Sequence, residues 1–112
     1  MYGTRMREAG WQVEETDAGD KALAVATRFQ PDVIVTDLNL PTLDGVAATQ
    51  ALKEDPLTAQ VPVIVISGFL FRSYEAYAAG CHTFLSKPCL PETLLEIMEQ
   101  IVGDAEVSSS KP

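Results

Sequence analysis

Two uninterrupted apolar runs, rich in β-branched residues, constrain what this chain can fold into more than any other feature. They lie within Asp32–Thr36 and Val61–Ile66. A strand with one face in water alternates apolar and polar residues, whereas a strand covered on both faces is apolar along its length. A third, shorter segment, Thr83–Ser86, also fits a covered strand. The sequence therefore predicts a parallel sheet with helices on both faces.

Helical patterns separate these strands. Apolar residues recur three and four positions apart, which is typical of the buried stripe of a helix. Helices are expected at about residues 2–9, 20–29, 45–53, 72–79 and 91–102. A weaker, alternating segment, Gln12–Thr16, is expected to be an edge strand. Regular alternation of helix and strand implies right-handed crossovers, so we predict an α/β fold with a doubly wound parallel sheet of four strands.

Size and charge limit the classes of function. The chain has 112 residues and a net charge of -8, and one domain over residues 1–103 with a flexible tail over residues 104–112 is expected. The acidic excess is spread along the chain, which predicts no direct binding of nucleic acid and no association with a membrane. Two cysteines, Cys81 and Cys89, are too few for a disulfide scaffold and favour a cytoplasmic protein.

Three polar residues follow the three strong strands. They are Asp37, Ser67 and Lys87. In an open parallel sheet, ligands bind outside the carboxyl ends of the strands. A carboxylate, a hydroxyl and an ammonium at this edge suit phosphoryl transfer: Asp37 as the nucleophile, Ser67 as a hydrogen-bond donor and Lys87 as the neutralising charge. An ordinary turn position after a strand would explain Ser67 alone, but it does not readily explain all three residues together.

The motifs around these residues resemble the receiver domain of two-component response regulators, the CheY-like domain. The matching segments are Asp37–Gly45, Val63–Gly68, Ala79–Gly80 and Phe84–Pro88, in the family's order over about residues 1–102. The resemblance implies a flavodoxin-like fold. It also implies a signalling function in a phosphorelay and a cis peptide bond between Lys87 and Pro88.

The resemblance assigns roles to single residues. Asp37 is implied to be the phosphoacceptor, fed by a histidine kinase or a phosphotransfer protein, with Ser67 and Lys87 as its partners. Asp37 and the backbone carbonyl of Asn39 are implied ligands of Mg²⁺. Phe84 is the implied switch aromatic, which turns inward when Ser67 moves toward the phosphoryl group. The face of the last two helices and the last strand is the implied output surface.

One departure from the family affects both chemistry and assembly. The family starts with an apolar strand that ends in two acidic residues, and this sequence starts inside the helix that follows. About 15–20 residues are missing by usual element lengths, and a truncated gene model is the simplest explanation. Because the acidic pair supplies the main Mg²⁺ ligands of the family, we expect a weak or lost metal site. We also expect an exposed strand edge and a strand-exchanged homo-oligomer.

Three functions stay open at this point. The first is a phosphorylation-switched receiver with a downstream effector that the sequence does not identify. The second is a pseudo-receiver, which binds partner proteins independently of phosphorylation. The third is a phosphatase of the haloacid dehalogenase type, which requires a second Asp where this chain has Asn39. We therefore expect no enzyme.

Overall fold

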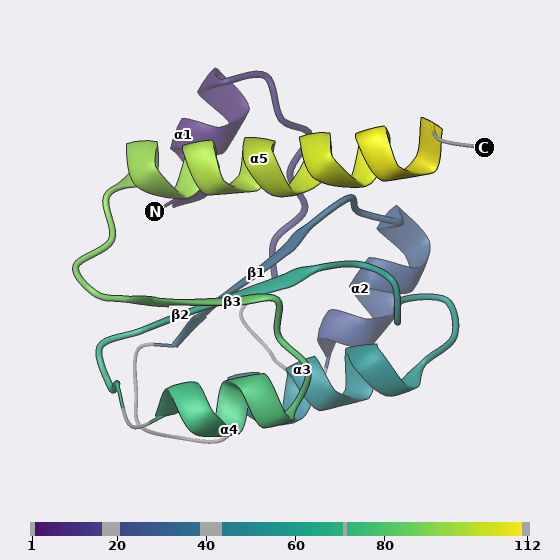
Figure 1. The fold of residues 1–112 in the computed structure, drawn as a ribbon, viewed down its shortest axis with the longest axis vertical. Helices are drawn as coiled ribbons and strands as arrows, with labels where there is room; N and C mark the ends of the chain where they lie inside the picture. The colour runs from purple at the N-terminus through teal and green to yellow at the C-terminus, as the bar shows by residue number, and fades with distance from the viewer. Residues whose placement is uncertain (1, 17–20, 39–43, 71, 111–112) are drawn as a thin grey trace. The chain divides into compact units, whose positions relative to one another are not determined.

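The chain divides into two units, each built from its own segments. The computed structural model describes residues 2–16, 21–38, 44–70 and 72–110. The central unit is Thr16–Pro88, and the terminal unit combines Met1–Glu15 with Cys89–Pro112. Figure 1 shows the sheet and helices α2, α3 and α4 in the central unit, and helices α1 and α5 in the terminal unit.

A parallel sheet of three strands forms the centre of the larger unit. The strands are β1 (Ile34–Leu38), β2 (Val63–Ser67) and β3 (Thr83–Ser86), in the spatial order β1-β2-β3. Leu38 pairs with Ser67, and Ser67 pairs with Ser86. The carboxyl ends of all three strands therefore lie side by side at one edge of the sheet.

Strand β2 is covered on both of its faces, as its uninterrupted apolar sequence predicts. Every residue from Val63 to Ser67 is buried. Alternate side chains of a strand point to opposite faces, so Val63 and Val65 share one face. Both belong to a core cluster with residues of the helices and the following turn: Ala26, Leu52, Ala76 and Cys81.

Helices α2 (Ala22–Phe29), α3 (Asp44–Glu54) and α4 (Arg72–Ala78) complete the central unit, and α3 contacts β1, α2 and α4. Helix α2 ends at Gln30, whose φ of 55° is left-handed, directly before Pro31, which cannot continue the helix. Gly80, with a φ of 103°, follows α4. A Cβ atom there would lie 2.9 Å from Lys53 Cγ, so glycine suits both the backbone and the space.

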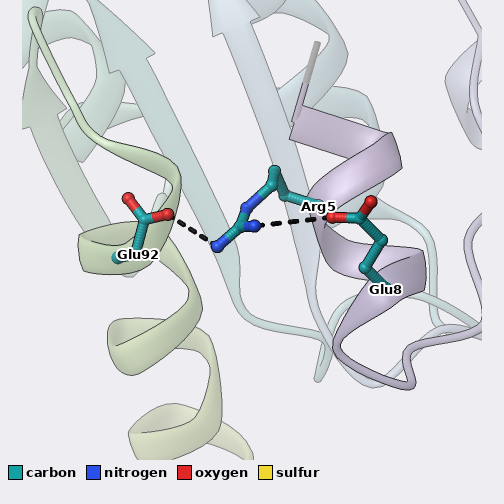
Figure 2. A network of polar contacts seen from close by, with 3 residues as sticks. All are labelled: Arg5, Glu8 and Glu92. Carbon is teal, nitrogen blue, oxygen red and sulfur yellow. Dashed lines mark hydrogen bonds and ion pairs between the residues drawn. The ribbon is translucent and has the colours of Figure 1, made fainter.

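The terminal unit consists of α1 (Tyr2–Glu8) and α5 (Pro91–Ser110). The predicted apolar stripe of α5 buries Leu94, Met98 and Ile101. The Tyr2 hydroxyl donates to the Cys89 carbonyl oxygen at 2.8 Å. Figure 2 shows Arg5 between two carboxylates, 2.6 Å from Glu92 and 3.4 Å from Glu8. These exposed ion pairs orient the ends of the helices more than they stabilise them.

The strand predicted at Gln12–Thr16 is wrong, so the sheet of the described residues has three strands instead of four. Among the described residues, no strand of the sheet pairs with this segment. Side chains of α1 take its polar groups instead: Arg7 donates to the Val13 carbonyl oxygen at 3.1 Å and to the Glu15 carboxylate at 3.0 Å. A carbonyl bonded in this way has no need of a ladder partner.

The last helix is longer than predicted. Its backbone continues through the expected flexible tail, from Asp104 to Ser110. Extending a formed helix costs much less than starting one, because each added residue closes one further hydrogen bond. The boundary of the domain at residue 103 stays a prediction. In the part of the chain that the structure describes, no helix is both long and apolar enough to span a membrane.

Candidate functional site

Asp37, Ser67 and Lys87 come from three neighbouring strands at the same edge of the sheet. Ser67 is the last residue of β2, and Lys87 directly follows β3. Asp37 lies within β1, one residue before its end, and not after the strand as its sequence position suggested. The two extra residues at the end of the strand form because Asp37 pairs with Ile66 and Leu38 pairs with Ser67.

The Asp37 carboxylate and the Lys87 ammonium form an ion pair. Their nearest atoms, Oδ1 and Nζ, lie 2.7 Å apart, and about 30% of each side chain is exposed. A charge-assisted contact of this length fixes both side chains while one side stays open to solvent. An anionic group that reaches Asp37 therefore meets a positive charge already in position.

Ser67 lies deeper than the ion pair. Its side chain is fully buried, and its Oγ accepts the Phe69 N–H at 3.0 Å. Its carbonyl oxygen accepts the Lys87 N–H at 2.9 Å, so the backbones of the two residues are tied together. Within the described residues, the proton of the Ser67 hydroxyl has no acceptor. The hydroxyl can therefore donate to a group that enters the site.

Phe84 connects this edge to the core. Its side chain is half-buried and packs against the core cluster. Its N–H points away from β2 and donates to the Tyr77 hydroxyl oxygen of α4 at 3.0 Å. Sequence reasoning missed Tyr77, because a tyrosine in a helical pattern carries no signal for a contact with a strand edge seven residues away.

Some of the remaining predicted features fall on residues that the structure describes, and others do not. The Lys87–Pro88 peptide bond is cis, as predicted. Asn39 lies outside the described residues. In the ranges that the structure describes, no group of three or more His, Cys, Asp or Glu side chains could hold a metal ion. The described side chains therefore do not fit a complete magnesium site.

Comparison with known proteins identifies the family. The model of the response regulator receiver domain matches residues 2–99. The polar-differentiation response regulator DivK of Brucella ovis is 31% identical over 107 residues, which cover 94% of this chain and 87% of DivK. DivK of Brucella anthropi matches with the same identity and coverage.

Solved structures share the fold. Chemotaxis protein CheY4 of Vibrio cholerae is 29% identical, with a TM-score of 0.78 over 88% of this chain and 84% of that one. The receiver domain of a sensor histidine kinase of Pseudomonas aeruginosa is 27% identical, with a TM-score of 0.79 over 90% and 84%. That structure is described with a magnesium ion coordinated in its active-site cleft.

The parallel order of the strands and the similarity to these relatives indicate the same family. The fold is the flavodoxin-like parallel sheet with helices that CheY-like proteins share. The chain belongs to the response regulator receiver domains of two-component systems.

Proposed function

We propose that the chain accepts a phosphoryl group on Asp37 from a histidine kinase or a phosphotransfer protein and thereby switches a protein-binding surface in the cytoplasm. The ion pair between Asp37 and Lys87, at 2.7 Å and open to solvent on one side, is the observation that carries this proposal. A carboxylate held in one position by a cation is oriented for attack, and the cation remains to balance the incoming charge.

The transfer step uses the described side chains as follows. A carboxylate oxygen of Asp37 forms a bond to phosphorus while the bond from phosphorus to the donor nitrogen breaks. The imidazole nitrogen of the donor histidine keeps the electron pair of that bond. The Lys87 ammonium then neutralises a phosphoryl oxygen, and the Ser67 hydroxyl donates a hydrogen bond to another.

Ser67 is the residue that has to move in this scheme. Its side chain is fully buried and its Oγ accepts the Phe69 N–H, so we propose that the hydroxyl moves toward the phosphoryl group and gives up that bond. We propose that Phe84, which packs against the core cluster, then takes the space that Ser67 leaves. We propose that this exchange changes the surface of α4 and β3, which the Tyr77 hydroxyl joins to the Phe84 N–H.

Magnesium is expected to bind this chain weakly. Asp37 is the described carboxylate at this edge, and it is already engaged by Lys87. Mg²⁺ requires near-octahedral coordination by oxygen atoms, usually from more than one carboxylate and several waters. We therefore propose only a partial site, made by Asp37 and the backbone carbonyl of Asn39.

A matched pair of serine variants tests the proposal. The chain is incubated with acetyl phosphate and Mg²⁺, and the phosphorylated fraction is followed by intact-mass spectrometry. We expect labelling below one phosphoryl group per chain, lost in Asp37→Asn. Ser67→Ala should slow labelling about tenfold or more, because a hydrogen bond to a charged group is worth about 1.5–3 kcal/mol. Ser86→Ala, in register on the neighbouring strand, should label like the wild type.

Two outcomes would count against the proposal. Equal rates for the Ser67→Ala and Ser86→Ala variants would show that the buried hydroxyl takes no part. No labelling of a folded chain at any Mg²⁺ concentration, with partner binding retained, would favour the phosphorylation-independent pseudo-receiver.

A further inference from the structure

Helix α4 turns its large apolar side chains toward solvent and a small one toward the core. Ala76 is fully buried, whereas Tyr74 is 83% exposed and Tyr77 is 52% exposed. Leu70, which a turn joins to the start of the helix, is 66% exposed. Positions 70, 74 and 77 fall on one side of a helix, and a helix of a soluble domain normally has the opposite arrangement. This exposed apolar face is therefore suited to contact with another molecule.

An open groove lies between α3 and α4 and shares Tyr74 with this face. Its volume is about 400 Å³, within the range of about 300–1,000 Å³ that is usual for binding pockets. Most of its lining consists of short side chains, those of Val46, Ala47, Ala78 and Ala79. These short side chains leave space that a bulkier side chain of a partner can fill.

The α4 side of the groove is held in place by contacts with the rest of the central unit. The Tyr77 hydroxyl oxygen accepts the Phe84 N–H at 3.0 Å. Ala76 of α4 and Leu52 of α3 belong to the same core cluster. The groove is therefore formed before a partner arrives, and a preformed site lowers the entropy cost of binding.

The charged groups at the groove are acidic. Glu75 lines it, and Gln50, which also lines it, donates to the Glu54 carboxylate at 3.4 Å. The Lys53 ammonium of α3 donates to carbonyl oxygens of the segment that follows the helix. Because the chain also carries a net charge of -8, its field favours a cationic partner and disfavours nucleic acid or an anionic membrane.

We infer that this groove binds a basic amphipathic helix of a partner protein. A large apolar side chain of that helix fills the space over Ala47 and Ala78, and a Lys or Arg one turn away lies near Glu75. A helix suits the groove better than an extended strand, because α3 and α4 present side chains and no open ladder of backbone groups. The surface lies on the α3 side of α4 and so differs from the output face that the family resemblance implies.

Two synthetic peptides test the inference when each is titrated into the ¹⁵N-labelled chain and followed by NMR. One is an amphipathic helix of about 16 residues, a length at which helices begin to be stable, built from Leu, Ala and Lys with one Trp on its apolar face. The other has Glu in place of every Lys. The basic peptide should shift the amide resonances of Ala47, Ala78 and Ala79, bind more weakly as salt is added, and bind at least about tenfold more tightly than the acidic peptide. No phosphoryl donor is present, so the result does not depend on the phosphorylation of Asp37.

Two matched pairs of variants locate the contact. Tyr74→Ser should weaken binding of the basic peptide about tenfold, and it should fold because the side chain that it removes is largely exposed. Leu57→Ser removes a side chain that is 72% exposed and does not line the groove, so binding should not change. Glu75→Gln should weaken binding and reduce its salt dependence. Glu96→Gln removes the same charge from an exposed position of α5 and should change neither.

Three results would overturn the inference. Equal affinities of the basic and acidic peptides would show that charge does not select the partner. Equal affinities of the Tyr74→Ser and Leu57→Ser variants, or shifts confined to elements other than α3 and α4, would place the contact elsewhere. No shift with the basic peptide at concentrations up to about 1 mM would show that the groove binds no such helix.

Discussion

Lys87 contacts the other two residues of the proposed site through both its charged side chain and its backbone. Its ammonium pairs with Asp37 at 2.7 Å, and its N–H donates to the Ser67 carbonyl oxygen at 2.9 Å. The residue is thus linked to both other members of the proposed site, one through its side chain and one through its main chain. A substitution that keeps the charge but changes the side-chain length would preserve only the second link.

Cys81 and Cys89 should differ in reactivity. Cys81 is 7% exposed, and burial raises the pKa of its thiol, partly offset by the Lys53 ammonium. The thiolate is the reactive form, so the raised pKa of Cys81 lowers the fraction of its thiol that can react at a given pH. Iodoacetamide followed by peptide mass spectrometry should therefore label the half-exposed Cys89 first and Cys81 only after denaturation. Equal labelling rates in the native chain would contradict the burial of Cys81.

Sequence could predict the residues of the site but not their contacts. Asp37, Ser67 and Lys87 were expected at one edge because parallel strands align their carboxyl ends. The bond from the Phe69 N–H to Ser67 Oγ and that from the Phe84 N–H to the Tyr77 hydroxyl were missed. Both depend on side-chain direction, which residue types and spacing do not specify. Asn39 and the role of the site as phosphoacceptor stay predictions.

Among the elements, the connection from α3 to β2 depends on polar side chains. Lys53 donates to the carbonyl oxygens of Ala59 and Val61, and burial lowers the pKa of its ammonium. The hydroxyl of Thr58, which is 1% exposed, donates to the Leu52 carbonyl oxygen at 2.6 Å. The Thr58 bond satisfies a carbonyl group in the last turn of α3 that the helix itself cannot bond, and the Lys53 bonds satisfy carbonyl groups of the segment that follows the helix.

Replacing Thr58 by Val should destabilise the chain by about 1–3 kcal/mol, because the buried Leu52 carbonyl group loses its donor with little change in volume. Thr93→Val, at an exposed position of α5, is the control and should change stability by less than about 0.5 kcal/mol. Urea unfolding followed by circular dichroism gives both values. A Thr58→Val variant as stable as the control would show that the bond contributes nothing.

The helices and strands show which kinds of structure the sequence pattern predicts correctly and which it does not. Thr83–Ser86 is a strand with the predicted bounds, and α2 ends at Gln30, before Pro31, as predicted. Gln12–Thr16 was predicted wrongly because alternation describes only the residues of a strand, and a strand also needs a partner. The helix α5 passes its expected end, because extending a formed helix costs much less than starting one.

At the scale of the whole molecule, the order of the elements carries more information than any one of them. Alternating helices and covered strands predicted a parallel α/β fold, and the family and fold of the relatives confirm it. The number of strands could not be predicted in this way, since it depends on which segments find partners. Among the described residues, β1 and β3 are the outer strands of the sheet, and β2 lies between them.

The central claim is that Asp37 accepts the phosphoryl group, and mapping the modified carboxylate tests it most directly. After incubation with acetyl phosphate, borohydride reduces an aspartyl phosphate to homoserine, which peptide mass spectrometry locates. The account predicts homoserine at position 37 and an unchanged Asp32, an exposed carboxylate five residues earlier in the same segment. Homoserine at Asp32 or at another carboxylate, with position 37 unmodified in a folded chain, would contradict it.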